Sequence, residues 1–238
     1  MRKRLVVLFL VAIACGAAIA SACSGGSEPS DATLTEEAEP TEEIDEELRD
    51  FVATLVLTAD DMPDPVVRAL DEEWQTDPFD QQFPQAEGFN TVTVGWSGTY
   101  SRPFLLETED GVTYTAANAA MAFTGSGGPL ASIAAARRID RRALGLEFVL
   151  GSTATGYEIV DVTVAAGEDA YALVYTGPVP GEEVELLSAQ VMFASGPVLG
   201  IVGVVGFVEL DEELLAELAR LLDERIQAGL AEPDNPLS

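Results

Sequence analysis

The chain has 238 residues, of which 41 are Asp or Glu, 12 are Lys or Arg and none is His, so its formal charge at pH 7 is −29. Hydrophobic residues make up 47% of it, which is enough to fill the interior of a domain of ordinary size. A surface this negative repels phosphate, so a nucleic-acid-binding role is excluded unless a local basic patch overrides the total charge.

The first 22 residues have the pattern of a secretory signal peptide, with basic residues at positions 2–4 before an uncharged run over residues 5–22. Small residues end this run immediately before Cys23, and residues 20–23 resemble a bacterial lipobox. The resemblance implies that Cys23 is acylated, with palmitate or a similar chain, and anchors the protein in the lipid bilayer at the outer face of the cell membrane. Residues 20–22 also fit an ordinary signal-peptidase site, whose cleavage would release a soluble secreted protein.

Cleavage before Cys23 leaves 9 arginines, no lysine and no histidine against 41 acids, a charge of 9 − 41 = −32. Without histidine, the Ser-His-Asp and Cys-His catalytic arrangements and imidazole zinc sites are excluded. Without lysine, the Ser-Lys dyad, the pyridoxal phosphate Schiff base and the phosphate-loop lysine are excluded as well. We therefore expect no enzyme, no cofactor and no metal. The alternative that survives is a carboxylate-dependent hydrolase.

Residues 23–50 read as an acidic linker, because residues 24–50 contain eleven acids and one arginine. Its last part has helical periodicity, which continues to residue 57. The sequence Leu-Thr-Ala-Asp-Asp-Met-Pro over residues 57–63 introduces the folded part, and we expect one globular domain over residues 51–229 with a tail over residues 230–238.

Trp74 and Trp96 belong to a group of aromatic residues between positions 74 and 104. Two interpretations stay open. These rings could line an apolar pocket, or they could simply fill the core, as large rings usually do.

Strands are expected over residues 91–100 and 113–123, followed by an alanine-rich helix over residues 130–144. This helix carries four arginines on one arc, namely Arg137, Arg138, Arg141 and Arg142. They could form an anion-contact patch for lipid headgroups or an acidic partner. They could equally neutralise acids within the chain and complement the negative end of the helix.

In the C-terminal half, alternation predicts strands over residues 157–164 and 170–176 and a hairpin of residues 184–193 and 198–208. Residues 191–208 carry no charge, as a membrane-spanning helix would require, but Gly196, Pro197 and many β-branched residues favour two strands. An amphipathic helix is expected over residues 211–228. Its predicted buried stripe is Leu214, Leu218, Leu221, Leu222 and Ile226.

The stretch 169–226, with the lipobox and the segment 57–63, resembles small bacterial lipoproteins that have a PsbP-like or LpqN-like α/β/α sandwich. The resemblance implies a single α+β domain with an antiparallel β-sheet covered by helices, and it transfers no functional residue. We expect an extracytoplasmic, non-catalytic binding or interaction module. Its expected ligand is an envelope partner or a small apolar molecule, and its oligomeric state is open. The acidity also fits a halophilic source.

Overall fold

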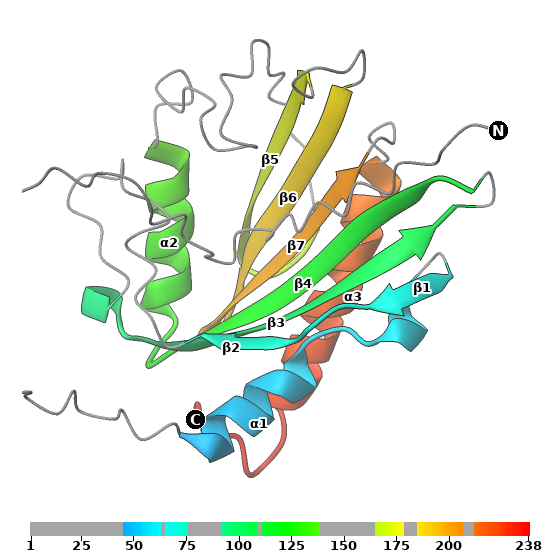
Figure 1. The fold of residues 1–238 in the computed structure, drawn as a ribbon. Coiled ribbons are helices and arrows are strands. Elements are labelled where there is room, and N and C mark those ends of the chain that lie inside the picture. Colours follow the sequence, from blue (N-terminus) through cyan, green and yellow to red (C-terminus); the bar gives the residue numbers. More distant parts are fainter. Residues whose placement is uncertain are drawn as a thin grey trace, which may run out of the picture.

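The computed structural model describes residues 45–62, 65–75, 92–108, 111–138, 165–178, 185–206 and 212–238. Within these ranges the chain forms seven strands and three α-helices (Figure 1). The strands are β1 (Val66–Ala69), β2 (Glu73–Gln75), β3 (Trp96–Glu107), β4 (Thr113–Phe123), β5 (Asp169–Pro178), β6 (Glu185–Ser195) and β7 (Val198–Gly206). The helices are α1 (Glu46–Leu55), α2 (Gly127–Arg138) and α3 (Glu212–Leu230), with 3-10 turns η1 (Ala59–Asp61) and η3 (Val92–Val94).

All strands join one antiparallel sheet in the order β1-β3-β4-β7-β6-β5, and β2 also pairs with β3. This confirms the predicted α+β class and the antiparallel sheet covered by helices. Four of the pairings join strands that are adjacent in the sequence (β2–β3, β3–β4, β5–β6 and β6–β7), whereas β1 pairs with β3 and β4 pairs with β7 at the centre of the sheet. Figure 1 shows α1 and α3 on one face of the sheet and α2 on the other, so the layers are helix, sheet and helix.

Strand β3 lies further along the chain than predicted, because it begins at Trp96 and runs through Pro103 to Glu107. Proline has no N–H and therefore fits a strand only where no neighbouring strand needs that donor. The structure accommodates it because β2 pairs with residues 99–101 of β3 and β1 with residues 104–106, so Pro103 falls in the gap between them. The carbonyl of Pro103 faces this edge, where it accepts from Leu70 N at 3.1 Å.

The uncharged stretch 191–208 forms strands rather than a membrane-spanning helix. Its described part comprises the end of β6, a turn at Gly196 with φ 55° and the whole of β7, as predicted. No helix within the described ranges is both long enough and apolar enough to cross a membrane. Gly200 pairs with Phe193 and lets that ring lie across β7, since a Cβ on Gly200 would be 2.2 Å from Phe193 Cζ.

Strand alternation divides the apolar side chains between two cores. The larger core lies between the sheet and helices α1 and α3, and it includes Phe104, Phe193 and Val202 with Leu55 and Leu222. The smaller core lies under α2. It is made by Ala119, Met121, Phe123, Ile133, Ala136, Tyr171, Met192, Ala194, Leu199 and Ile201.

Helix α3 confirms the predicted stripe at Leu218, Leu222 and Ile226, which are all buried. Leu214 and Leu221 are only half-buried and pack at the margin of the larger core, whereas Leu215 and Ala219 are fully covered. The buried stripe is therefore shifted toward Leu215 and Ala219 relative to the predicted one.

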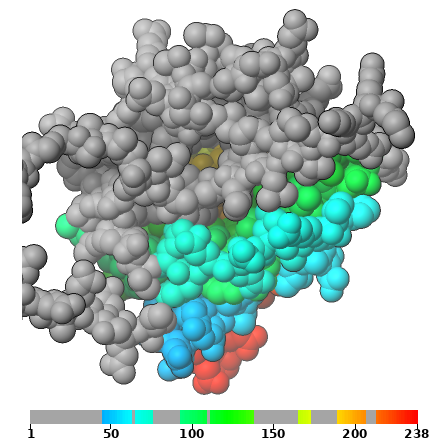
Figure 2. All heavy atoms as spheres, viewed as in Figure 1, coloured from blue at the N-terminus to red at the C-terminus, as the bar shows by residue number. Residues whose placement is uncertain are grey.

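Ordered structure extends beyond both ends of the range 51–229. Helix α1 starts at Glu46, and the Asp45 carboxylate caps it by accepting from Leu48 N at 3.0 Å. After α3, Asn235 is buried and donates to Leu230 O at 3.1 Å, and Leu237 packs against the larger core. Figure 2 shows α1 in blue beside the C-terminal residues in red at one pole of the molecule.

Candidate functional site

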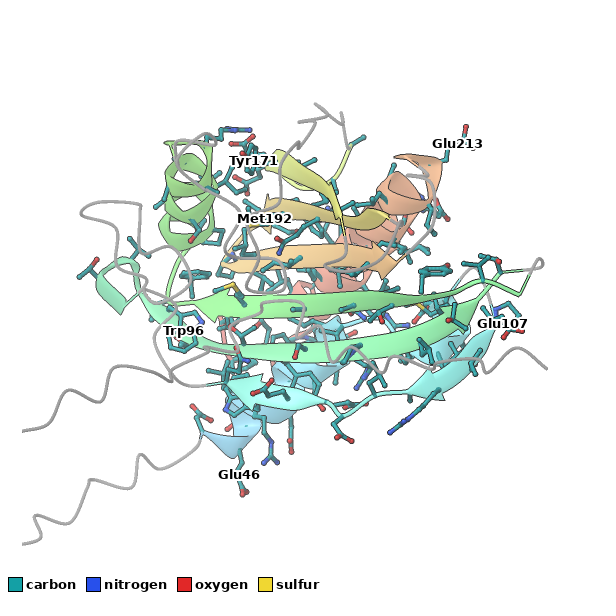
Figure 3. The ribbon with its side chains drawn as sticks, turned by 45° about the horizontal axis from the view of Figure 1, so that its top comes forward. Glu46, Trp96, Glu107, Tyr171, Met192 and Glu213 are labelled. Carbon is teal, nitrogen blue, oxygen red and sulfur yellow. The ribbon has the colours of Figure 1, made fainter. Side chains whose placement is uncertain are left out.

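The two tryptophans lie on opposite faces of the sheet and do not share a pocket. Trp74 packs against the larger core, with its ring over Gly98, where an added Cβ would lie 2.3 Å from Trp74 Cη2. Trp96 packs against the smaller core, which lies under α2 and includes Met192 of β6 (Figure 3). Its Nε1 donates to Thr99 Oγ1 at 3.0 Å.

The predicted arginine patch is described only in part. Arg137 forms a bidentate ion pair with Asp169, with N···O distances of 2.7 and 2.6 Å, and its Nη2 also donates to Ala170 O at 2.8 Å. Its guanidinium is thus occupied within the chain, on the side of α2 that faces β5. Arg138 ends α2, and its side chain lies outside the described part, as do Arg141 and Arg142. Cys23 also lies outside it.

A dense set of polar contacts fixes the neck, residues 56–62, which joins α1 to the sheet. Asn118, 2% exposed, accepts from Leu57 N at 2.6 Å and donates to Arg102 O at 3.0 Å. Arg102 Nη1 donates to Leu57 O at 3.3 Å. Arg225 of α3 donates to Val56 O at 3.2 Å. Three side chains from distant parts of the sequence therefore hold two consecutive residues.

Asp61 completes the neck. Its carboxylate accepts from the N–H and the hydroxyl of Thr58 at 2.7 Å each and pairs with Arg225 at 2.8 Å. Burial alone would raise the pKa of Asp61. The bonds from Thr58 and the charge of Arg225 outweigh burial, so the pKa lies below its ordinary value.

Two other acids are held by arginines of the sheet and of α2. Hydrogen bonds from Arg102 lower the pKa of Glu72 despite its partial burial, and Tyr100 also donates to that carboxylate. Hydrogen bonds from Arg137 lower the pKa of Asp169 in the same way. Together with Asp61, these carboxylates are therefore held ionised at neutral pH, and each braces two elements.

One open depression in the described part combines charged, polar and apolar side chains. It has a volume of about 460 Å³ and lies between the last turns of α3, the β6–β7 turn and the start of β5. We call it the α3 pocket. Its lining includes Gly167, Glu168, Ser195, Gly196, Gln227 and Leu230.

Asp223 lies directly behind the α3 pocket and connects two of its walls. The residue is 8% exposed, and its Oδ2 accepts from Gly167 N and from Gln227 Nε2, both at 2.9 Å. Its Oδ1 is buried and accepts no hydrogen bond from the described residues. Such a buried acceptor costs about 1–3 kcal/mol of stability.

Ser195 adds a hydroxyl group to the lining of the α3 pocket. Strand alternation turns its side chain to the same face as Val191 and Phe193, which α3 covers. Ser195 is 4% exposed and lines the pocket.

Sequence reasoning missed the α3 pocket, since Gly167, Ser195 and Gly196 are ordinary turn residues when read locally. The sequence did contain one indication of the pocket. Position 223 follows 219 by four residues and precedes 226 by three, so it falls on the buried arc of α3, where a carboxylate is unusual. No three or more Cys, Asp or Glu side chains in the described ranges are grouped to hold a metal ion.

Comparisons with known proteins identify the fold. No protein-family model matches the chain, and a search of curated proteins finds no match. The chain is similar in structure to the extracellular domain of PknH from Mycobacterium tuberculosis, known from a crystal structure. The TM-score is 0.50 at 11% sequence identity, and the match covers 74% of this chain and 96% of that domain. At this identity, the two proteins share a fold.

Proposed function

We propose that this protein is an exported, non-catalytic binding or interaction module, held at the outer face of the cell membrane through an acylated Cys23. The observation that carries the proposal is the order of two features along the chain. A signal-like leader ending in a lipobox-like Cys23 precedes a domain that shares its fold with an extracellular domain. The resemblance of residues 169–226 to PsbP-like or LpqN-like lipoproteins supports the same setting.

The state of the acids supports a binding role over the hydrolase alternative. A carboxylate that acts as a general acid needs a raised pKa. Among the described acids whose pKa departs from its ordinary value, the direction is downward in each case, namely for Asp61, Glu72, Asp169 and Glu217. Each is paired with an arginine, and the first three of these pairs brace the fold.

The test is fractionation of a bacterial host that expresses the full chain, compared with the variant Cys23→Ser. We expect the unaltered protein in the membrane fraction, exposed to added protease at the outer face, and the variant in the soluble exported fraction. Equal distribution of both proteins would contradict the anchor. Turnover of a glycoside that is lost when one carboxylate is replaced by its amide would contradict the binding role and support the hydrolase.

A further inference from the structure

We infer that the α3 pocket binds a primary ammonium group carried on a short alkyl chain. The inference rests on the proposed binding role and deepens it by naming the chemistry of the ligand. It is argued from the charge of the pocket, from its hydrogen-bonding groups and from the shape of its apolar side.

The charge of the α3 pocket favours a cation. Glu168 is exposed on its rim and Asp223 lies behind it, while no lysine or arginine is among its described lining residues. The pocket also lies beside the last turn of α3, where the helix dipole is negative. A ligand with one positive charge is attracted by all three features.

The polar groups of the α3 pocket are acceptors, which matches an ammonium with its three N–H donors. The Nε2 group of Gln227 is engaged with Asp223, so its Oε1 remains as an acceptor. Ser195 contributes a hydroxyl oxygen to the lining of the pocket. Gln227 is exposed, and when its side chain turns aside an ammonium can donate to the Asp223 carboxylate in place of the amide.

The geometry distinguishes a primary ammonium from other cations. A guanidinium seeks both oxygens of one carboxylate, but Asp223 Oδ1 is buried and Oδ2 keeps its hydrogen bond from Gly167 N, so a two-oxygen contact is not open to it. A quaternary ammonium is recognised by aromatic rings, and none is among the described residues that line the pocket. Leu230 and Ala231 provide an apolar side along which a short alkyl chain can lie.

This chemistry occurs in free diamines and in the lysyl side chains of peptides, and titration calorimetry of the full chain in detergent separates these sources. The probes are 1,4-diaminobutane, a lysine blocked at both backbone ends, and butyltrimethylammonium as a cation without N–H donors. Binding of either amine in preference to butyltrimethylammonium supports the inference, and the tighter amine identifies the source. Absence of amine binding, or equal binding of the quaternary cation, overturns it.

Three variants locate the binding. We expect Glu168→Gln and Ser195→Ala each to weaken amine binding about five-fold, as the loss of one exposed ion pair or one hydrogen bond would. Glu107→Gln removes the same charge far from the pocket and should leave the affinity unchanged. Gly98 of β3 lies at the pocket end of the sheet, since it pairs with Ala122 and Ala122 pairs with Val198, two residues after Gly196. Glu107 is about 30 Å further along β3, at its opposite end (Figure 3). Weakening by Glu107→Gln equal to that by Glu168→Gln would show only general attraction to the acidic surface and would overturn the inference. Fractionation with Cys23→Ser does not depend on any of these results, so the two proposals fail separately.

Discussion

Replacement of Asn118 by alanine tests the strongest physical claim about the fold, that the neck is held by buried side chains of the sheet. The Asn118 side chain satisfies Leu57 N at 2.6 Å and Arg102 O at 3.0 Å. Leu57 is 1% exposed, so its N–H is shielded from bulk water. The variant therefore leaves a buried backbone N–H without a partner.

The expected loss of stability follows from these two contacts. An orphaned buried N–H costs about 1–3 kcal/mol and the lost bond to Arg102 O about 1 kcal/mol, so the free energy of unfolding should fall by about 2–4 kcal/mol. In a domain of this size, that corresponds to a drop in melting temperature of roughly 4–16 °C. Urea unfolding of the full chain, followed by circular dichroism, measures the change as a lower midpoint at constant slope.

A matched control makes the result specific to the neck. Thr115→Ala removes a polar side chain of similar size from the same strand, where it is half-buried on the α2 face. This control should cost less than about 1 kcal/mol. The reasoning is refuted if Asn118→Ala lies within about 0.5 kcal/mol of the unaltered protein, or if the control is equally destabilised.

Three further outcomes are expected. Gly200→Ala places a Cβ 2.2 Å from Phe193 Cζ and should lower the free energy of unfolding by about 1–3 kcal/mol in urea; an unchanged midpoint would contradict the packing described for β7. The folded-state pKa values of Asp61, Glu72 and Asp169 are lowered, so the stability they contribute is present above their ordinary values of 3.8, 4.5 and 3.8 and is lost as the pH falls through the folded values. Stability should therefore decline between about pH 5 and pH 2, less steeply in Asp61→Asn, and equal slopes in both proteins would contradict the role of Asp61. Finally, if repulsion within a chain of formal charge −29 opposes folding, about 1 M NaCl should raise the urea midpoint, and a midpoint independent of salt would argue against halophilic adaptation.

Local sequence patterns predicted those helices and strands whose own apolar spacing and turn residues indicate where they lie and which side is buried. The β6–β7 hairpin was predictable because Gly196 and Pro197 break an uncharged run of β-branched residues. Helix α3 was predictable from its leucine spacing. Only the rotation of its buried face was predicted inaccurately. Strand β3 was misplaced because the tolerance for Pro103 depends on where β1 and β2 end, which no local rule contains.

The candidate site depends on contacts between segments that are far apart in the sequence. Gly167 and Asp223 are 56 positions apart, yet their hydrogen bond sets one wall of the α3 pocket. The faces of Trp74 and Trp96 are fixed by the pairing of β2 with β3 and of β3 with β4, so their separation was not readable from composition. Arg137 shows the same limit, because its partner Asp169 is 32 positions away on another element.

The most direct test of the anchored, exported state is the mass of one peptide. Because the chain has no lysine or arginine between Cys23 and Arg49, trypsin releases residues 23–49 as a single N-terminal fragment of a protein processed before Cys23. In protein purified from the membranes of a bacterial host, we predict that this fragment carries the added mass of acyl chains on Cys23. The same fragment with an unmodified cysteine, or a longer one that still contains leader residues, would contradict the account.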